Sequence, residues 1–531
     1  MATRIATILI GLAFLALAQP GVEAFAQKYG GILKTTIRRN PPSLSINEES
    51  TNDTVWCMSP VYNNLVYHDL FAGVESPDTI RPELAEAWRW SGDGRRLTFK
   101  LRQGVTWHDG QPFTAKDVKF TFDVIRGVHE QKFKLNPRKV WYFNVTEVTT
   151  NGDHEVTFHL ARRQPSLLGM LAGGYSPVYP AHVKNVRDLR LTSLGTGPFK
   201  LKVFDRDKSI ELVKNPDYFV KGRPYLDGVH FAIVKSRATR VAVLQSNQID
   251  IAFPLDTPKP VADTLKESVP QLAFERKVST SNVNILVNDK DPPFNNLKVR
   301  QAINLALERN SLIKSVYGGA GVPGGLMLPP PSGAWGMTPG QLAAAPGFGD
   351  AEANRAKARK LLAEAGYGPG NPLRINMSTR GVATYKRPAL WTVGELKKVG
   401  IEAELEIVDP AQWYSKLARR EYQFATNVTA NAVDDPDAIL YENFKCGSER
   451  NYTDYCNKEM EQRFDAQSME TDHAKRLAMA RAIDVQMLDD VVRPVLTFRV
   501  YYFARWPYVK NFVPSQSMFN KWRMQELWLD R

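Results

Sequence analysis

Strand-like and helix-like patterns alternate along both halves of this chain, and the alternation limits the folds open to it. Three segments have the two-residue period or the β-branched content of strands, namely 29–37, 84–103 and 400–408. The clearest is 84–103, in which apolar and polar residues alternate after the turn sequence SGDG at 91–94. This segment predicts a β-hairpin with one buried face.

Helical patterns separate these strands. Thr114, with Asp117 three residues later, resembles a capping box that opens a helix. Residues 299–317 carry apolar side chains at helical spacing, and 351–365 form a second helical run that Gly366 can end in the left-handed conformation. Strands and helices mixed in this way, without a repeat of about 20 to 50 residues, predict α/β lobes and argue against a repeat array.

The first 26 residues predict a secretory signal peptide. Arg4 precedes a mostly apolar run over residues 5–18, and Ala24-Phe25-Ala26 gives a cleavage site before Gln27. This run is too short to span a bilayer, and no cysteine at the cleavage site suggests a lipid anchor. We expect a mature protein of about 505 residues, exported to the periplasm of a Gram-negative bacterium and divided into two or three domains.

Basic residues outnumber acidic ones, with 69 Lys and Arg against 56 Asp and Glu and a net charge of +13. Such a balance can favour nucleic acid, anionic lipid or acidic solutes. The basic residues are spread along the chain, however, and the densest group, within 355–360, lies on the polar face of the helix predicted at 351–365. We therefore expect a solvated surface and no nucleic-acid binding.

The chain lacks common motifs of catalysis and metal binding. It has no G-x-S-x-G, H-E-x-x-H or Walker sequence, and its eight histidines show no paired spacing typical of a metal site. Gly319, Gly321 and Gly324 match G-x-G-x-x-G, but they follow a predicted helix and lead into a proline run, which does not suit a phosphate cradle. We expect no catalytic residues, no metal site and no cofactor.

One segment, 431–456 (NAVDDPDAILYENFKCGSERNYTDYC), combines clustered aspartates with two cysteines. A calcium loop does not fit, because Pro436 breaks the required spacing and no central Gly is followed by a distal Glu. A catalytic pair of Asp434 and Asp437 would need carboxylates that face each other across a bond, which residues this close on a turn rarely do. An exported hydrolase is therefore the less favoured alternative.

The same segment also fits the start of a helix. Asp435 or Asp437 is well placed to cap a helix over AILYENF, with the intervening proline in the first turn. That role does not prevent the neighbouring Asn431, Ala432 and Asp434 from lining a pocket. We predict that these three residues form the rim of a ligand site, with Asp434 as the partner of a cationic group.

The cysteines of this segment predict a disulfide. Cys446 and Cys456 are ten residues apart in a chain expected to enter an oxidising compartment, and three cysteines are too few for a four-cysteine zinc site. A disulfide that closes this short loop should contribute roughly 2 to 3 kcal/mol. The third cysteine, Cys57, is expected to be buried and inert.

Several segments, in the same order along the chain, are similar to the dipeptide, oligopeptide and nickel class (family 5) of periplasmic solute-binding proteins, the soluble receptors of ABC importers. The segments are RPELAEAWRWSGDGRRLTFKLRQGVTWHDGQPFTAKDVKFTFDVI at 81–125, GTGPFKLKVFDRDKSIELVKNPDYF at 195–219, VAVLQSNQIDIAF at 241–253, PPFNNLKVRQAINLALERNSLI at 292–313, and the paired cysteines with NYTDYCN. The resemblance covers almost all of the expected mature chain.

The resemblance implies an α/β fold of two lobes that close like a clamshell, with mixed sheets flanked by helices and an extra inserted subdomain. The implied parts are lobe I at 27–48, 170–274 and 499–531, the inserted subdomain of lobe I at 49–169, and lobe II at 275–498. Two strands, near 279–287 and 495–503, would cross between the lobes. Apolar alternation over 496–502 independently favours a strand there.

The resemblance also implies a receptor, and no enzyme, that captures a peptide or peptide-like solute between the lobes and delivers it to an ABC permease in the inner membrane. Closure of hinged lobes over the solute would create the form presented to the permease. We expect a monomer that binds reversibly, with a free energy of about 8 to 12 kcal/mol. Apolar burial would supply much of this energy, and a few polar groups would orient the solute.

One departure from the family concerns the solute's amine. Dipeptide binders of the family place an aspartate for the peptide ammonium three residues before the first Asp of D-P-D, and that position is Ala432 here. Other organic solutes, such as an opine, an oligosaccharide or a metal chelate, are therefore alternatives to a peptide. We further predict that Trp56 and Tyr385 enclose the solute and that Arg380 pairs with a carboxylate, with core packing or a surface ion pair as the alternatives.

Overall fold

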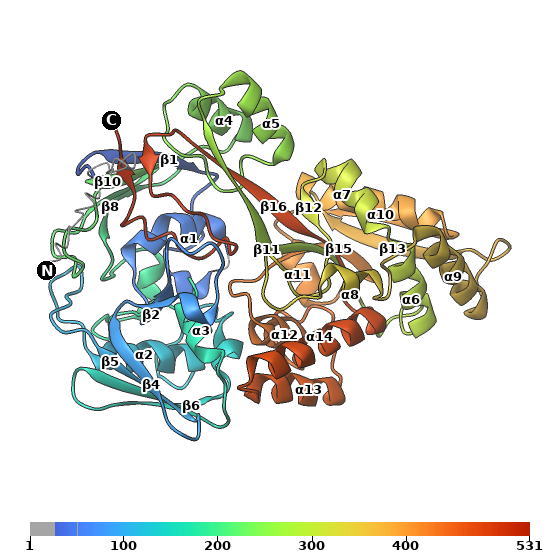
Figure 1. The fold of residues 1–531 in the computed structure, drawn as a ribbon, viewed down its shortest axis with the longest axis horizontal. Helices are drawn as coiled ribbons and strands as arrows, with labels where there is room; N and C mark the ends of the chain where they lie inside the picture. Colours follow the sequence, from blue (N-terminus) through green and yellow to red (C-terminus); the bar gives the residue numbers. More distant parts are fainter. Residues whose placement is uncertain (1–26, 50) are drawn as a thin grey trace, which may run out of the picture.

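The computed structural model describes residues 27–49 and 51–531, and the predicted signal peptide, 1–26, lies outside the described residues. The chain forms two lobes side by side, and two long strands run between them (Figure 1). Lobe I, as we use the term, contains two four-stranded sheets, and lobe II contains one six-stranded sheet. None of the described helices is long and apolar enough to cross a membrane.

The first sheet of lobe I begins with the predicted N-terminal strand. Its order is β1 (Ile32–Ile37), β10 (Gly228–Ile233), β9 (Ser209–Lys214) and β8 (Phe199–Asp205). β1 lies parallel to β10, and the other neighbours are antiparallel. The C-terminal tail returns to this lobe, so that Trp522 packs edge-on against Trp56 at 4.8 Å between ring centroids. Lobe I is thus built from both ends of the described chain.

The second sheet of lobe I contains the predicted hairpin. Its order is β4 (Ala85–Trp90), β5 (Arg96–Leu101), β7 (Glu155–Leu160) and β6 (Val145–Thr150), all antiparallel. The turn at 91–94 joins β4 and β5, which confirms the hairpin. Thr114 and Asp117 form the predicted capping box at the start of α2 (Ala115–Arg126), which packs on β6 and β7.

The sheet of lobe II is mixed. Its order is β12 (Gly321–Val322), β16 (Val495–Arg505), β11 (Ala273–Val287), β15 (Phe424–Ala430), β13 (Leu373–Arg380) and β14 (Ile401–Val408). β13 is parallel to β14 and β15, while the pairs around β11 and β16 are antiparallel. The predicted strand at 400–408 is therefore confirmed as β14.

The long strands that run between the lobes are β11 and β16. They pair from Ala273 opposite Arg505 to Asn284 opposite Val495, and the pairing is interrupted between Val278 and Asn282. These strands contain the segments expected to cross between the lobes, and apolar alternation over 496–502 is confirmed as strand. The exact boundaries of lobes and inserted subdomain stay predictions.

Helices cover the sheet of lobe II and continue below it in Figure 1. They are α6 (Leu297–Ala306), α7 (Arg309–Tyr317), α8 (Pro339–Ala343), α9 (Ala351–Glu364), α10 (Ala383–Lys397), α11 (Trp413–Ala418), α12 (Pro436–Phe444), α13 (Lys458–Met469) and α14 (His473–Asp490). The remaining elements of lobe I include α1 (Asn52–Met58), β2 (Val66–His68), β3 (Ile80–Pro82), α3 (Leu167–Ala172), α4 (Arg237–Gln245), α5 (Lys259–Ser268), β17 (Val509–Lys510) and β18 (Trp528–Leu529).

One helix prediction is wrong in its extent. The pattern at 299–317 predicts a single helix, but the structure has two, α6 and α7. Leu307 adopts an extended conformation, and the Glu308 side chain accepts hydrogen bonds from the backbone N–H groups of Asn310 and Ser311 to cap α7. A local cap of this kind leaves the apolar spacing nearly unchanged, so periodicity did not reveal the break. Gly366, by contrast, takes the predicted left-handed conformation just after α9, with φ 88°.

The predicted disulfide is present. Cys446 and Cys456 are joined, with 4.9 Å between their Cα atoms, and they close the loop between α12 and α13. Cys57 is free and buried, and burial raises the pKa of its thiol well above the usual value. A thiol that stays protonated is a poor nucleophile, so the structure agrees with an inert Cys57.

Removing the disulfide should destabilise the protein. We expect Cys446→Ser with Cys456→Ser to lower the free energy of unfolding by roughly 2 to 3 kcal/mol, because the unfolded chain regains loop freedom. Urea denaturation with and without reductant measures this effect. A reductant should lower the urea concentration at the unfolding midpoint of the wild type and leave that of the double variant unchanged. Equal stability of wild type and variant without reductant would contradict the assigned role.

Candidate functional site

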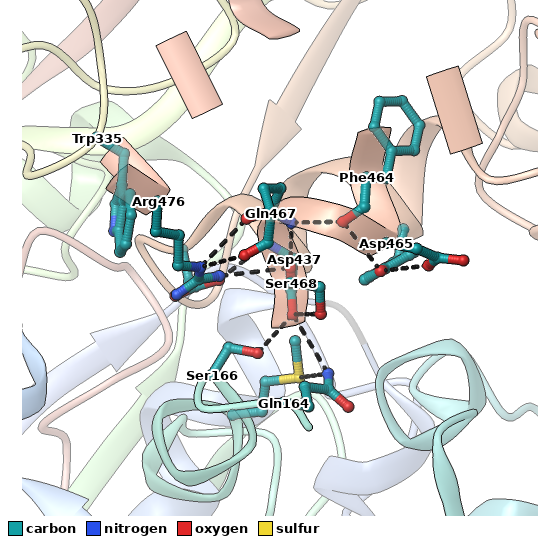
Figure 2. Close-up of polar contacts among 12 residues, drawn as sticks. Gln164, Ser166, Trp335, Asp437, Phe464, Asp465, Gln467, Ser468 and Arg476 are labelled. Carbon is teal, nitrogen blue, oxygen red and sulfur yellow. Dashed lines mark hydrogen bonds and ion pairs between the residues drawn. The ribbon is translucent and has the colours of Figure 1, made fainter. Parts of the chain in front are cut away.

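The two lobes meet along α12 and the segment before it, and Asp437 lies at the centre of this contact (Figure 2). Its Oδ2 accepts hydrogen bonds from Ser166 of lobe I and Ser468 of lobe II, each at 2.6 Å. Gln467 donates to Oδ1, and the Arg476 guanidinium lies 3.4 Å from that oxygen. A fully buried carboxylate needs such partners, and here they come from both lobes.

More hydrogen bonds and ion pairs join the lobes beside Asp437. Arg162 of lobe I donates to the Tyr441 hydroxyl at 2.7 Å and to the Asp465 carboxylate at 2.6 Å. Asn520 of the C-terminal tail donates to the main-chain oxygen of Ala432 at 2.9 Å. We call this contact, formed by residues 431–444 with lobe I, the interlobe seam.

A second buried polar cluster lies farther along α12. The Glu442 carboxylate accepts from Trp141 Nε1 at 3.0 Å, and Arg138 and Arg450 lie 3.4 and 2.9 Å from it. The Arg138 guanidinium also lies 3.8 Å from the centroid of the Tyr175 ring. Burial, the largest single influence, lowers the pKa of Arg450, but the Glu442 carboxylate and the nearby hydroxyls of Tyr452, Tyr414 and Tyr175 together raise it above its ordinary value. The cluster therefore keeps opposite charges from both lobes in contact.

Sequence reasoning did not identify Glu442 or its partners as members of the site. A signal was present, because Glu442 is a charged residue within the mostly apolar helix AILYENF. Charged residues are rarely buried unless they are paired. Its partners Arg138 and Trp141 are separated from it by about 300 residues of sequence, and nothing local to either segment predicts that they meet.

Asn431 and Ala432, predicted to line a pocket, lie in the interlobe seam. The Thr280 hydroxyl, in the interruption of the β11–β16 pairing, donates to the main-chain oxygen of Asn431 at 2.6 Å. Ala432 and Val433 pack into the apolar core cluster of lobe I. Their closeness to lobe I places both residues where the lobes meet, but a role in ligand binding stays a prediction.

Asp434 faces a loop of lobe II. Its Oδ2 accepts from the Ala334 backbone N–H at 3.0 Å, and its main-chain oxygen accepts from Trp335 Nε1 at 2.9 Å. Its Oδ1 is buried and has no hydrogen-bond partner among the described residues. Burial, with smaller contributions from Asp435 and Glu75, raises the pKa of Asp434 to about 7. Pairing of Asp434 with a cationic group of a solute stays a prediction.

Asp435 confirms the helix-cap interpretation. It is the N-cap of α12, its side chain accepts from the Asp437 backbone N–H, and Pro436 occupies the first turn. The same carboxylate forms a two-pronged pair with Arg476, at 2.7 and 2.9 Å. These contacts occupy Asp435 and orient the start of α12.

Arg380 and Tyr385, on lobe II, form part of an aromatic cluster. The Arg380 guanidinium lies 5.7 and 5.2 Å from the ring centroids of Tyr385 and Tyr414, and it donates to the Pro410 oxygen at 3.2 Å. Within the described chain Arg380 has no carboxylate partner, and its Nε has no acceptor. The alternative of a surface ion pair for Arg380 is therefore not found among the described residues. Tyr385 packs edge-on against Trp413.

Trp56 lies in the core of lobe I. It is 1% exposed and packs edge-on against Phe231 and Trp522. This environment corresponds to the core-packing alternative weighed for Trp56. Contact between Trp56 and a solute stays a prediction, and such contact would require the tail around Trp522 to move.

A cavity of about 540 Å³ lies beside the interlobe seam. Its walls come from residues 126–145 of lobe I and from 445–450, which include the first half of the disulfide loop. Arg450 belongs to this lining and also to the Glu442 cluster. The size is within the range of about 300 to 1,000 Å³ that ligand pockets occupy. In residues 27–49 and 51–531, no group of three or more His, Cys, Asp or Glu side chains could hold a metal ion.

A second buried aspartate holds the same loop that contacts Asp434. Asp484 of α14 accepts from the Leu326 backbone N–H at 2.6 Å, and its Oδ2 has no partner in the described part of the chain. Burial raises the pKa of Asp484 to about 7. Gly325 lies so close that an added Cβ would be 2.3 Å from Asp484 Oδ1, which explains glycine at this position. The loop is thus anchored at two carboxyl groups.

Residues 79–451 match the family model of bacterial extracellular solute-binding proteins, family 5 middle. The dipeptide-binding protein of Escherichia coli K12 is 27% identical over 482 residues, which cover 86% of this chain and 86% of that protein. Both comparisons agree with the resemblance seen in the sequence.

Solved structures show the same fold. The periplasmic binding protein DppA of Helicobacter pylori, in complex with the peptide STSA, has a TM-score of 0.80 at 21% identity, covering 95% of this chain and 99% of that one. The binding protein AgaA from A. tumefaciens R10, in complex with agropinic acid, has a TM-score of 0.78 at 23% identity, covering 94% and 99%. The predicted two-lobed α/β fold is confirmed.

The two buried aspartates should make stability depend on pH. Both have pKa values near 7 in the native protein, whereas unfolded Asp titrates near 3.9. The native state therefore holds protons that the unfolded chain has lost, and this contribution to stability falls as pH rises from about 4 to about 7. We expect Asp434→Asn with Asp484→Asn to be more stable than the wild type at about pH 8, by on the order of 2 to 4 kcal/mol.

Urea denaturation at about pH 5 and pH 8 measures the difference. Asp435→Asn is the matched control, because it removes a carboxylate that pairs with Arg476 and should lower stability at both pH values. If the free energy of unfolding of the double variant changed with pH as much as that of the wild type, these two groups would not titrate between about pH 5 and pH 8.

Proposed function

Because this chain belongs to family 5 of the bacterial extracellular solute-binding proteins, we propose that it captures a peptide or peptide-like solute between its two lobes and delivers it to the permease of an ABC importer. The sequence-based interpretation as a binding protein, and not an enzyme, is confirmed by the family. The observation that carries the proposal is the interlobe seam, in which buried polar groups of one lobe find their partners on the other.

The seam supports closure around a solute. Asp437 and Glu442 are satisfied in the closed arrangement by Ser166 and Trp141 of lobe I. When the lobes separate, these groups must exchange their partners for water. Because both acceptors are carboxylates, each such hydrogen bond contributes about 1.5 to 3 kcal/mol net, the difference between the protein partner and water. A solute that contacts both lobes stabilises the closed form and can therefore select it.

For the solute we favour a peptide. The E. coli relative is named for dipeptides and the H. pylori structure holds STSA, while the structure with agropinic acid keeps an opine as an alternative. An oligosaccharide or a metal chelate would be accommodated by the same fold. Ala432 offers no carboxylate for a peptide ammonium, so recognition has to depend on other groups.

Among the predicted contact residues, Arg380 and Tyr385 have the most suitable geometry. The Arg380 guanidinium lies beside the tyrosine rings and forms no ion pair with a described residue, so its outer N–H groups can pair with a solute carboxylate, while its Nε is buried. Asn431, Ala432 and Asp434 would contribute from the seam, Asp434 through its Oδ1, which has no partner among the described residues. Trp56 would contribute only if the C-terminal tail opened.

We propose that the protein acts in the periplasm, after removal of the signal peptide predicted at 1–26, as a monomer that does not bind nucleic acid. The family description as extracellular proteins supports export. The receptor role supports this location, since the carrier has to reach a permease in the inner membrane.

A thermal-shift screen tests the receptor assignment. Peptides of two to five residues, opines, oligosaccharides and chelated metals are added separately, and one class should raise the melting temperature. A solute at a hundred times its dissociation constant adds about 2.7 kcal/mol of stability. Mass spectrometry of the recovered solute is the control for catalysis. No shift with any class, or recovery of a cleaved solute, would contradict the assignment.

Substitution of Arg380 tests its predicted role. Arg380→Gln should weaken binding of a solute with a free carboxylate by at least about tenfold and spare the amidated form of that solute. Arg374→Gln is the matched control, because Arg374 is on the same strand, β13, and pairs with Glu402 at the surface. Calorimetric titration gives both affinities, and equal losses in the two variants would refute a specific contact with Arg380.

A further inference from the structure

The cavity beside the interlobe seam has a basic lining drawn from both lobes. Arg126 and Lys139 come from lobe I, and Lys445 and Arg450 come from the segment around the disulfide, while Glu449 is the acidic residue of the lining. Cavities that gather one sign of charge concentrate solutes of the opposite sign. The composition of this lining therefore favours an anion.

Two of these four cations have no carboxylate partner within the described chain. Arg126 pairs with Asp123 at 2.9 Å and Arg450 with Glu442 at 2.9 Å, and both partners lie outside the lining. Lys139 and Lys445 form no ion pair within 4.0 Å of any described residue, although Lys445 lies near enough to Glu461 to help lower the pKa of that carboxyl. Their ammonium groups are available to a ligand without first breaking an internal ion pair.

The floor of the cavity is apolar and aromatic. Phe143 belongs to the lining, and the Lys445 Nζ lies 4.8 Å from the centroid of its ring and 5.3 Å from that of Tyr441. These contacts hold the ammonium group at the junction of the two lobes. A solute with an apolar or planar body and an acidic group matches both the floor and the lysines.

The cavity is also connected to the contact that closes the lobes. Arg450 lies in the lining and shares Glu442 with Arg138 and Trp141 of lobe I. A solute in the cavity would contact residues of both lobes, and its charge would interact with the Glu442 cluster through Arg450. Its binding would therefore favour the closed arrangement of the lobes.

We propose that this cavity is an anion subsite of the solute cleft and that the transported solute is acidic, an acidic peptide or a related organic polyacid. This inference rests on the proposed receptor function and specifies its substrate class. The acidic group lies between Lys139 of lobe I and Lys445 of lobe II, and the rest of the solute extends along the seam.

A matched pair of peptides tests the inference. Ala-Glu-Glu and Ala-Gln-Gln have nearly the same shape and differ in charge. We expect the wild type to bind Ala-Glu-Glu at least about tenfold more tightly, and the preference to weaken as salt is raised. Lys139→Gln with Lys445→Gln should remove most of the preference, chiefly by weakening the binding of Ala-Glu-Glu. Glu449→Gln should increase the preference, because it removes the anion of the lining.

The control variant is Lys208→Gln with Lys235→Gln. It changes the net charge by the same amount, at exposed lysines of lobe I that lie outside the cavity lining, and it should keep the preference. Melting temperatures of the unliganded variants establish that each is folded.

The outcomes separate this inference from the receptor assignment. Equal binding of the two peptides, or a preference that survives in Lys139→Gln with Lys445→Gln, would overturn the anion subsite while leaving a peptide receptor intact. Binding of neither peptide would also overturn the acidic-peptide inference. The broader screen of solute classes then decides independently whether the protein is a receptor.

Discussion

The antiparallel pair of β11 and β16 is the constraint on which the rest of the structure depends. These two strands run between the lobes and belong to the sheet of lobe II, so the lobes cannot separate without bending this pair (Figure 1). The pairing is interrupted between Val278 and Asn282. There, the Thr280 backbone N–H donates to Gln516 of the C-terminal tail, and its hydroxyl donates to Asn431 of the seam. The interruption in the strands and the contact between the lobes thus share one residue.

The interlobe seam explains how the lobes can open and close about this hinge. Polar groups at an interface that opens must be able to form hydrogen bonds both with their protein partners and with water. Asp437 and Glu442 meet this requirement, because each is fully hydrogen-bonded when the lobes are closed and can be hydrated when they are open. Apolar contacts such as that of Val433 with lobe I stabilise the closed form, but they do not fix the orientation of the lobes as hydrogen bonds do. The seam is consistent with a receptor whose lobes can open and close.

The sequence predicted local structure well and long-range contacts poorly. The hairpin at 84–103, the Thr114–Asp117 capping box and the Asp435 cap depend on residues within a few positions of each other, so their chemistry is visible in the sequence. The break at Leu307 was missed because it hardly alters the apolar spacing. Asp437 was offered as an alternative helix cap, whereas the cap is Asp435 and Asp437 lies within α12. Its contact with Ser166 spans 271 positions, and no local pattern predicts it. The charged cavity was invisible for the same reason.

Closure of two hinged lobes on a solute is the central claim, and the distance between the lobes tests it most directly. Spin labels at Glu147→Cys on β6 and Arg463→Cys on α13 would lie at exposed positions of lobe I and lobe II. The native cysteines would not interfere, because Cys57 is buried and the other two form the disulfide. Pulsed electron–electron double resonance measures the distance between the two labels. Without solute it should give a broad distribution that includes longer distances, and with solute it should give one short distance. A single distance that a bound solute leaves unchanged would contradict the account.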